Sequence, residues 1–147
     1  MHEAVISKEE LVRLLEAEFP ETFHAESGLS IQAIRYGGCR VRQEFLKTSL
    51  RPGGTVSGPS MMLLADVSVY VAVLASIGWT PLAVTTNLTI NFLKKPAPSA
   101  LEAECHLLKL GKPLAVGAVS LRSEGDEDLV AHAISTYSIP PRSLADR

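Results

Sequence analysis

The sequence predicts an α+β domain in which an antiparallel β-sheet wraps around one long apolar helix. Residues 59–77 are apolar on nearly every side of a helix, begin with Pro59, which suits a first helical turn, and are followed by Gly78, which suits a helix end. From residue 84 onward, apolar-rich segments alternate with short turns that contain glycine or proline, as antiparallel strands do. A helix without a polar face has to be buried, so we expect the sheet to cover it.

A second, shorter helix is expected at the N-terminus, over about residues 7–19. Ser7 and Glu10 have the spacing of a capping box, and Pro20 ends the helix. Its apolar residues share one face, which is typical of an amphipathic helix on the surface of a domain.

Six segments are expected to form strands. The first two flank Gly37-Gly38, a spacing typical of a β-hairpin with a primed two-residue turn. The last four are expected to follow one another as an antiparallel meander, and alternation in the first of these puts Thr85 on its polar face. The six segments are residues 31–36, 39–45, 84–92, 101–110, 114–122 and 129–139.

Composition excludes several classes of function. The chain has 147 residues, 46% of them apolar, and a formal net charge of -2, which fits one globular domain over residues 1–147. No run of like charges suggests a nucleic-acid partner. Cys39 and Cys105 lie far apart in the sequence and lack the clustering of a metal site, so we expect no metal, no cofactor and no disulfide framework. The N-terminus has no apolar signal segment, and we therefore expect a cytoplasmic protein.

Asp66 is the only charged residue between Arg51 and Lys94, and it lies in the middle of the long apolar helix. The helix is barely long enough to span a membrane, and a carboxylate would be costly there, so we expect burial in protein and no membrane partner. A buried carboxylate must still be compensated. Either it bonds to a neighbouring hydroxyl or backbone group and only orients the helix, or it lines a site and acts as a base or nucleophile.

The start of the same helix, Ser57-Gly58-Pro59, is the second candidate element. Free N–H groups and a partial positive charge at a helix start can polarise a carbonyl oxygen, although an ordinary glycine-rich cap would have the same sequence. Gly58 and Asp66 are about 12 Å apart along a helix, too far to act on one carbonyl group. We therefore expect a homodimer in which the start of one helix lies beside Asp66 of the other.

The segments TVSGPSMMLLAD and AVTTNLTINFLKKP, with the strands that follow, resemble the hotdog-fold acyl-CoA thioesterases of the phenylacetate-degradation (PaaI-like) family. The resemblance covers about residues 45–138 and implies hydrolysis of an acyl-CoA to a free acid and coenzyme A by a homodimer or a dimer of dimers. It also implies that Asp66 activates water or attacks the carbonyl, that the Gly58 amide of the other chain holds the oxyanion, and that Thr85 positions the water.

The sequence departs from the family pattern at three positions. The family usually has His-Gly-Gly at the helix start and Asn six residues before the His; here Ser57, Pro59 and Arg51 take the places of the His, the second Gly and the Asn. Arg51 either pairs with Asp66 across the interface or recognises a carboxylate or polar group on the acyl chain. Four lysines either bind the nucleotide phosphates, as the resemblance implies, or are solvated surface charges: Lys94, Lys95, Lys109 and Lys112.

The main competing hypothesis is a hotdog domain that binds acyl-CoA or another apolar ligand without turning it over, because the family histidine is missing. A dehydratase is less favoured, since none of the four histidines lies near the start of the long helix. The residues around Ser60 lack the second glycine of a nucleophile elbow, which excludes a serine hydrolase of that type.

Overall fold

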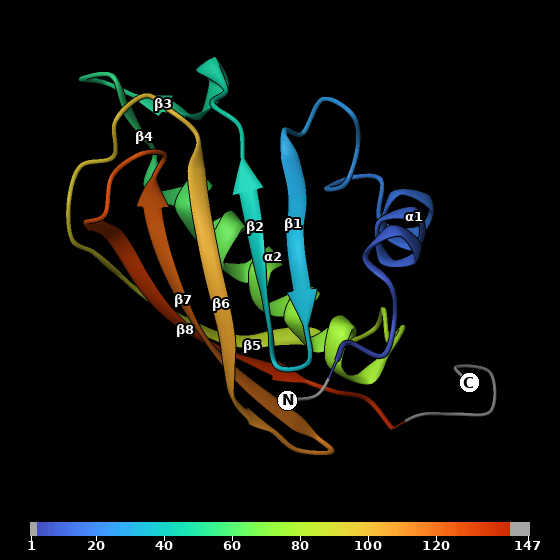
Figure 1. The fold of residues 1–147 in the computed structure, drawn as a ribbon. Coiled ribbons are helices and arrows are strands. Elements are labelled where there is room, and N and C mark those ends of the chain that lie inside the picture. The colour runs from blue at the N-terminus through green and yellow to red at the C-terminus, as the bar shows by residue number, and fades with distance from the viewer. Residues whose placement is uncertain (1–2, 142–147) are drawn as a thin grey trace.

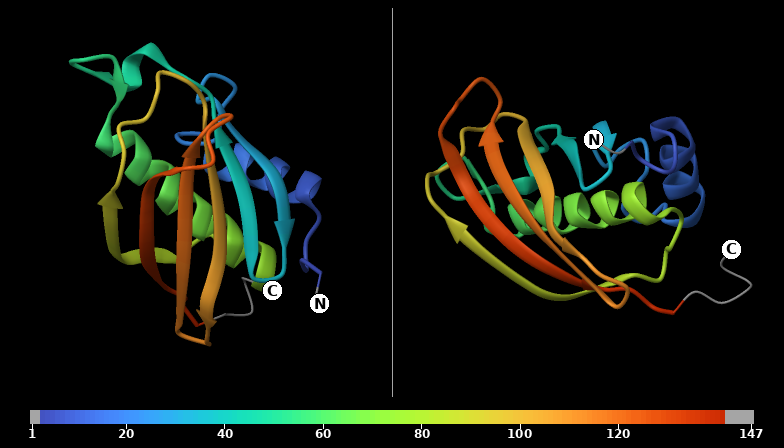
Figure 2. Two further views of the ribbon diagram at one scale, coloured as in Figure 1. Left: turned by 60° about the vertical axis from the view of Figure 1, so that its left-hand side comes forward. Right: turned by 60° about the horizontal axis from the view of Figure 1, so that its bottom comes forward.

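The computed structural model describes residues 3–141 and has the expected α+β architecture (Figure 1). Six strands form one curved antiparallel sheet around the long helix α2, and Figure 2 shows the sheet bending around it. In chain order the elements are α1 (Lys8–Glu18), β1 (Leu29–Arg35), β2 (Gly38–Gln43), the 3-10 turn η1 (Lys47–Ser49), β3 (Leu50–Arg51), β4 (Thr55–Val56), α2 (Gly58–Ile77), β5 (Val84–Phe92), β6 (Leu101–Leu110), β7 (Leu114–Ser123) and β8 (Leu129–Ser138).

The strand order in the sheet is β1-β2-β6-β7-β8-β5, and β3 and β4 pair separately. The expected meander is confirmed for β6, β7 and β8, but it is wrong for β5, which pairs with β8 from Val84↔Ser138 to Phe92↔Ala131. The connection of residues 93–100 carries the chain from this edge to β2, with which β6 pairs instead. Consequently β5 is an edge strand of the sheet.

The turn between β1 and β2 consists of Tyr36 and Gly37, one residue earlier than expected. Only Gly37 has a positive φ, of 84°, whereas both primed turns need a positive φ at their first central residue. The prediction of a primed turn is therefore wrong. Gly38 belongs to β2, where a Cβ would lie 2.6 Å from the carbonyl oxygen of Cys105 on β6. Close strand approach, rather than turn geometry, requires this second glycine.

Helix α1 covers part of the domain with its apolar face. Ser7 caps it by accepting a hydrogen bond from the Glu10 N–H at 3.1 Å. The Glu10 carboxylate bonds to Arg13 at 2.6 Å rather than turning back to Ser7, so only half of the expected capping box forms. Leu11 and Leu15 are fully buried in the common core.

Helix α2 is the core of the domain. Ser57 caps it, Gly58 is its first residue, one earlier than expected, and Gly78 follows its end with a φ of 91°. The helix is long and apolar enough to cross a membrane. However, 72% of the apolar 18-residue stretch that passes this test is buried within the protein. The surrounding sheet thus accounts for its composition.

We expect Gly38→Ala to lower the free energy of unfolding by about 2 kcal/mol, because the added methyl group overlaps the Cys105 carbonyl oxygen. Gly111→Ala is the matched control: its Cβ would lie 3.4 Å from the nearest atom, at van der Waals contact. Urea unfolding of both variants measures the difference. Equal midpoints for Gly38→Ala and the wild type would contradict the close approach of β2 and β6.

Candidate active site

Asp66 lies in the middle of α2, half-buried, on the side of the helix that meets β5 and β8. It opens on a cleft of about 500 Å³, whose other walls come from the end of α1 and the loop after α2. Half of the chain's eight aromatic residues line this cleft: Phe19, Tyr70, Trp79 and Tyr137. We call it the acid cleft.

Two hydroxyl groups donate hydrogen bonds to one oxygen of Asp66. The Thr85 Oγ1 lies 2.5 Å from Oδ1, and the Tyr137 hydroxyl lies 2.8 Å from the same atom. The Tyr137 hydroxyl is also 3.1 Å from the carbonyl oxygen of Asp66. Within residues 3–141, no hydrogen bond or ion pair reaches Oδ2. The carboxylate therefore bonds to neighbouring hydroxyls and also faces a cleft.

A β-bulge turns Thr85 toward Asp66. Thr85 pairs with Tyr137, whereas Asn87 pairs with the residue before Tyr137, which leaves Thr86 as the extra residue of β5. Paired residues share a face of the sheet, so Thr85 faces the helix together with Tyr137 and Leu88. Strict alternation placed Thr85 on the face opposite to Leu88. That expectation is wrong, because the bulge shifts the alternation by one residue.

Tyr137 is a residue of the candidate site that no sequence pattern indicated. It is only 3% exposed. Burial and, to a smaller extent, the Asp66 charge raise the pKa of its phenol well above the ordinary value, so it remains a proton donor at neutral pH. Tyr70, with its ring centroid 6.0 Å away, has a pKa raised to about 12 by burial and donates to the carbonyl oxygen of Pro81 at 2.9 Å.

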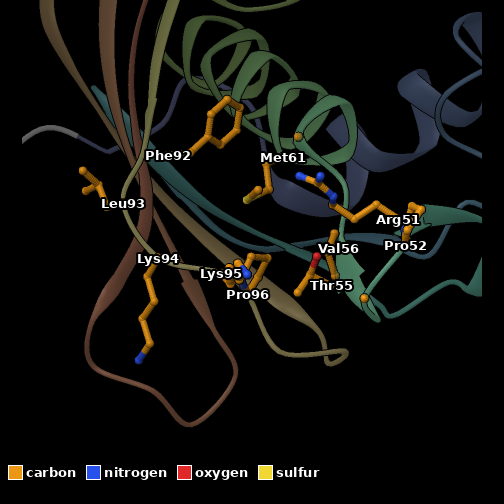
Figure 3. A pocket seen from close by; sticks show the side chains of 12 residues that line it. Arg51, Pro52, Thr55, Val56, Met61, Phe92, Leu93, Lys94, Lys95 and Pro96 are labelled. Carbon is orange, nitrogen blue, oxygen red and sulfur yellow. The ribbon is translucent and has the colours of Figure 1, made fainter.

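Gly58 lines a second cleft, of about 510 Å³, at the start of α2 (Figure 3). We call it the amide cleft. Its walls come from the β3–β4 hairpin, the first turn of α2 and the end of β5. The Gly58 N–H has no acceptor among residues 3–141. A Cβ on Gly58 would lie 3.2 Å from the Phe92 ring, so a side chain at this position would press against the ring.

The side chains of Ser57 and Ser60 contribute to the cap of α2. The Ser57 hydroxyl accepts a hydrogen bond from the Ser60 N–H at 3.4 Å and lies 3.0 Å from the Ser60 hydroxyl. Pro59 is exposed in the first turn. The amide cleft and the acid cleft share no lining residue, so one chain does not bring Gly58 and Asp66 to the same cavity.

Arg51 ends β3 at the wall of the amide cleft, and its side chain extends toward Met61 (Figure 3). In the part of the chain that the structure describes, its guanidinium forms no ion pair. An exposed cation thus borders a cleft whose other walls include Val56, Met61 and Phe92.

The four lysines are not brought together. Lys94 and Lys95 line the amide cleft, next to the start of β8. Lys109 and Lys112 lie at the turn between β6 and β7, near the end of β8 and so at the opposite end of the sheet (Figure 1). The resemblance placed all four at one phosphate site, which this arrangement does not permit within one chain.

Lys94 and Lys95 also differ in their partners. The Lys94 ammonium lies 2.7 Å from Asp126 and 3.4 Å from Asp128, and the hydrogen bond to Asp126 raises the pKa of Lys94. Lys95 forms no ion pair with the residues that the structure describes. Of the two lysines in the amide cleft, Lys95 is therefore the one whose charge is available to a ligand.

Comparisons with known proteins identify the family. The model of the Thioesterase superfamily matches residues 53–130, more than half of the chain. Among the curated proteins, none matches this sequence. A solved structure of a protein assigned as a thioesterase, from a Silicibacter species, is 48% identical, covers 95% of this chain and 96% of its own, and superimposes with a TM-score of 0.85.

More distant structures share the fold. Thioesterase superfamily member 2 of zebrafish is 18% identical, with 92% of this chain and 99% of that chain covered and a TM-score of 0.80. A mutant of the phenylacetic acid degradation protein PaaI of Thermus thermophilus is 23% identical, with 82% and 99% covered and a TM-score of 0.71. These matches confirm the resemblance drawn from the sequence. The chain belongs to the thioesterase superfamily and is a thioester hydrolase with the hotdog fold.

Proposed function

We propose that the protein hydrolyses an acyl-CoA to a free acid and coenzyme A in a site shared by two copies of the chain. One observation carries this proposal: the carboxylate with a free oxygen and the helix-start amide without an acceptor lie in separate clefts of one chain. Hydrolysis of a thioester needs both groups at one carbonyl. A second copy supplies the missing half of each site.

Strand β5 supports the homodimer. It is an edge strand, and an unpaired edge can pair with another strand. Apolar side chains remain exposed along it and on the neighbouring face of α2, with Val84 at 56%, Phe92 at 51% and Leu63 at 48%. A second copy whose β5 and α2 run antiparallel to the first would cover this surface. The same two-fold axis would bring the start of α2 in one chain beside Asp66 of the other.

In the shared site, Asp66 either takes a proton from a water molecule that attacks the thioester carbonyl or attacks this carbon itself. The Gly58 amide of the partner subunit and the positive end of its helix stabilise the oxyanion. Thr85, while donating to Asp66, keeps lone pairs with which it can accept a hydrogen bond from the water. When water attacks, collapse of the tetrahedral intermediate expels the coenzyme A thiolate, which receives the proton held by Asp66. When Asp66 attacks, expulsion of the thiolate leaves a mixed anhydride of Asp66 and the acyl group. Water then hydrolyses this anhydride, which restores the carboxylate, and a proton of that water passes to the thiolate.

Two cations support binding of an anionic substrate. Arg51, at the wall of the amide cleft, recognises a carboxylate or polar group of the acyl chain or else pairs with Asp66 of the partner subunit. Lys95 is suited to a nucleotide phosphate.

Cys39 and Cys105 are buried free thiols, which is compatible with the reducing cytoplasm in which we propose that the enzyme acts. Association of dimers into a tetramer stays a prediction.

We expect Asp66→Asn to abolish thiol release from acyl-CoA esters, because an amide neither accepts the proton nor attacks the carbonyl. A thiol dye measures release from aromatic, straight-chain and dicarboxylic esters, and size-exclusion chromatography checks that the variant is still a dimer. Equal rates in the wild type and the variant would refute the catalytic role. Saturable acyl-CoA binding without turnover in the wild type would instead favour a binding domain.

We expect Arg51→Asn to change the choice of acyl group more than the stability. If Arg51 binds an acyl carboxylate, the preference for dicarboxylic over straight-chain esters, as a ratio of kcat/KM, should fall by roughly 10-fold or more, the range of a charge-assisted hydrogen bond. Arg40→Asn, an exposed arginine on β2 outside both clefts, is the control. An unchanged ratio would rule out recognition of the acyl group by Arg51.

A further inference from the structure

We propose that Tyr137 is a positioning residue of the thioesterase site. Its hydroxyl and that of Thr85 hold Asp66 by Oδ1, so that Oδ2 is the oxygen presented to water or to the thioester carbon. This inference rests on the proposed function, since it assigns the work within that site to one of two otherwise equivalent oxygens.

The geometry separates the two oxygens of Asp66. Both donors are within 2.8 Å of Oδ1, and none of the described residues donates to Oδ2. The donors come from different strands, Thr85 from β5 and Tyr137 from β8, while Asp66 belongs to α2. Two hydrogen bonds from separate elements prevent the carboxylate from rotating about its Cβ–Cγ bond. An unpaired oxygen on a fixed group is what a general base or a nucleophile requires.

Tyr137 is itself held in place. Its ring is buried beside Tyr70, and the ring of Tyr70 is in edge contact with Phe19, each pair with centroids 6.0 Å apart. The ring centroid of Phe19 is in turn 5.7 Å from that of Phe23. This row of aromatic rings leads from the end of α1 to Asp66, so the hydroxyl has little freedom to leave the carboxylate. A buried phenol that stays protonated in the neutral range donates throughout it.

The hydrogen bond from the Tyr137 hydroxyl should affect the ionisation of Asp66, and this effect can be measured. A hydrogen bond donated to a carboxylate favours its ionised form, so loss of the Tyr137 hydroxyl should make the ionised form of Asp66 less favourable. The other titratable groups of the acid cleft are Glu18 at the end of α1 and Tyr70 on α2. In the proposed dimer, Arg51 of the partner subunit would add a charge to the shared site, because it lines the same cleft as the Gly58 amide. All of these groups are retained when only the Tyr137 hydroxyl is removed.

The test is the pH dependence of kcat/KM in Tyr137→Phe, with Tyr36→Phe as control. Tyr36 is an exposed tyrosine in the β1–β2 turn, outside both clefts. We expect the acid limb of Tyr137→Phe to move up by roughly one pH unit, the size of one hydrogen bond to a charged group. On the plateau above the acid limb, we expect kcat to fall about 10-fold with little change in KM, because the carboxylate is less well oriented.

A variant that melts at a lower temperature, but keeps the wild-type acid limb and plateau, would show that the hydroxyl serves folding alone and would overturn the proposal. If Tyr137→Phe does not fold, uniform replacement of tyrosine by 3-fluorotyrosine makes the phenol a stronger donor with nearly the same shape. The acid limb should then move to lower pH, and an unmoved limb would count against the proposal.

A titration without substrate separates this inference from the proposed function. ¹³C NMR of the Asp66 side-chain carboxyl in substrate-free protein should show a higher pKa in Tyr137→Phe than in the wild type. A wild type inactive on every acyl-CoA would overturn the proposed function, whatever the titration shows. An Asp66 titration that is identical in both proteins would overturn the role of Tyr137, whatever the enzyme hydrolyses.

Discussion

The structure depends on the burial of a helix that has no polar face. The six-stranded sheet covers most of α2, but the side of the helix beside edge strand β5 stays partly open, with Met62 and Leu63 exposed. Asp66 lies at this boundary, where two hydroxyls compensate its charge and a cleft still reaches it. Deeper in the core a carboxylate would be too costly, and on the surface it would be fully solvated. At this boundary a carboxylate is both partly desolvated and accessible.

Most elements of the fold could be predicted from local signals, because capping and periodicity depend on neighbouring residues. The cap at Ser57 and the glycine at position 78 place the ends of α2 within one residue. The position of β5 could not be predicted, since the pairing of β5 with β8 is decided by how the sheet closes around the helix. Gly38 shows a related limit: a glycine required by close strand approach looks the same in sequence as one required by a turn.

Some residues of the candidate site could likewise be predicted from the sequence, whereas others become apparent only in the fold. Asp66 was found because a lone charge in an apolar segment is visible in the sequence. Tyr137 could not be found, since an inward-facing aromatic residue on a strand resembles any core residue until the fold brings it to Asp66. Thr85 was found by resemblance, but its direction depends on a bulge that alternation does not reveal. The ion pair of Lys94 with Asp126 joins residues far apart in the chain.

A subunit-mixing experiment tests the shared site most directly. Gly58→Pro removes the amide N–H, and the extended Ser57 accepts a proline after it. The Phe92 ring, 3.2 Å from the added Cβ, has to move by a few tenths of an ångström. Homodimers of Gly58→Pro and of Asp66→Asn should each be inactive. Random exchange of their subunits should restore about a quarter of the wild-type rate, because half of the dimers are mixed and each mixed dimer has one site with both groups intact. Mixed dimers that are detected by native mass spectrometry but hydrolyse no thioester would contradict the account.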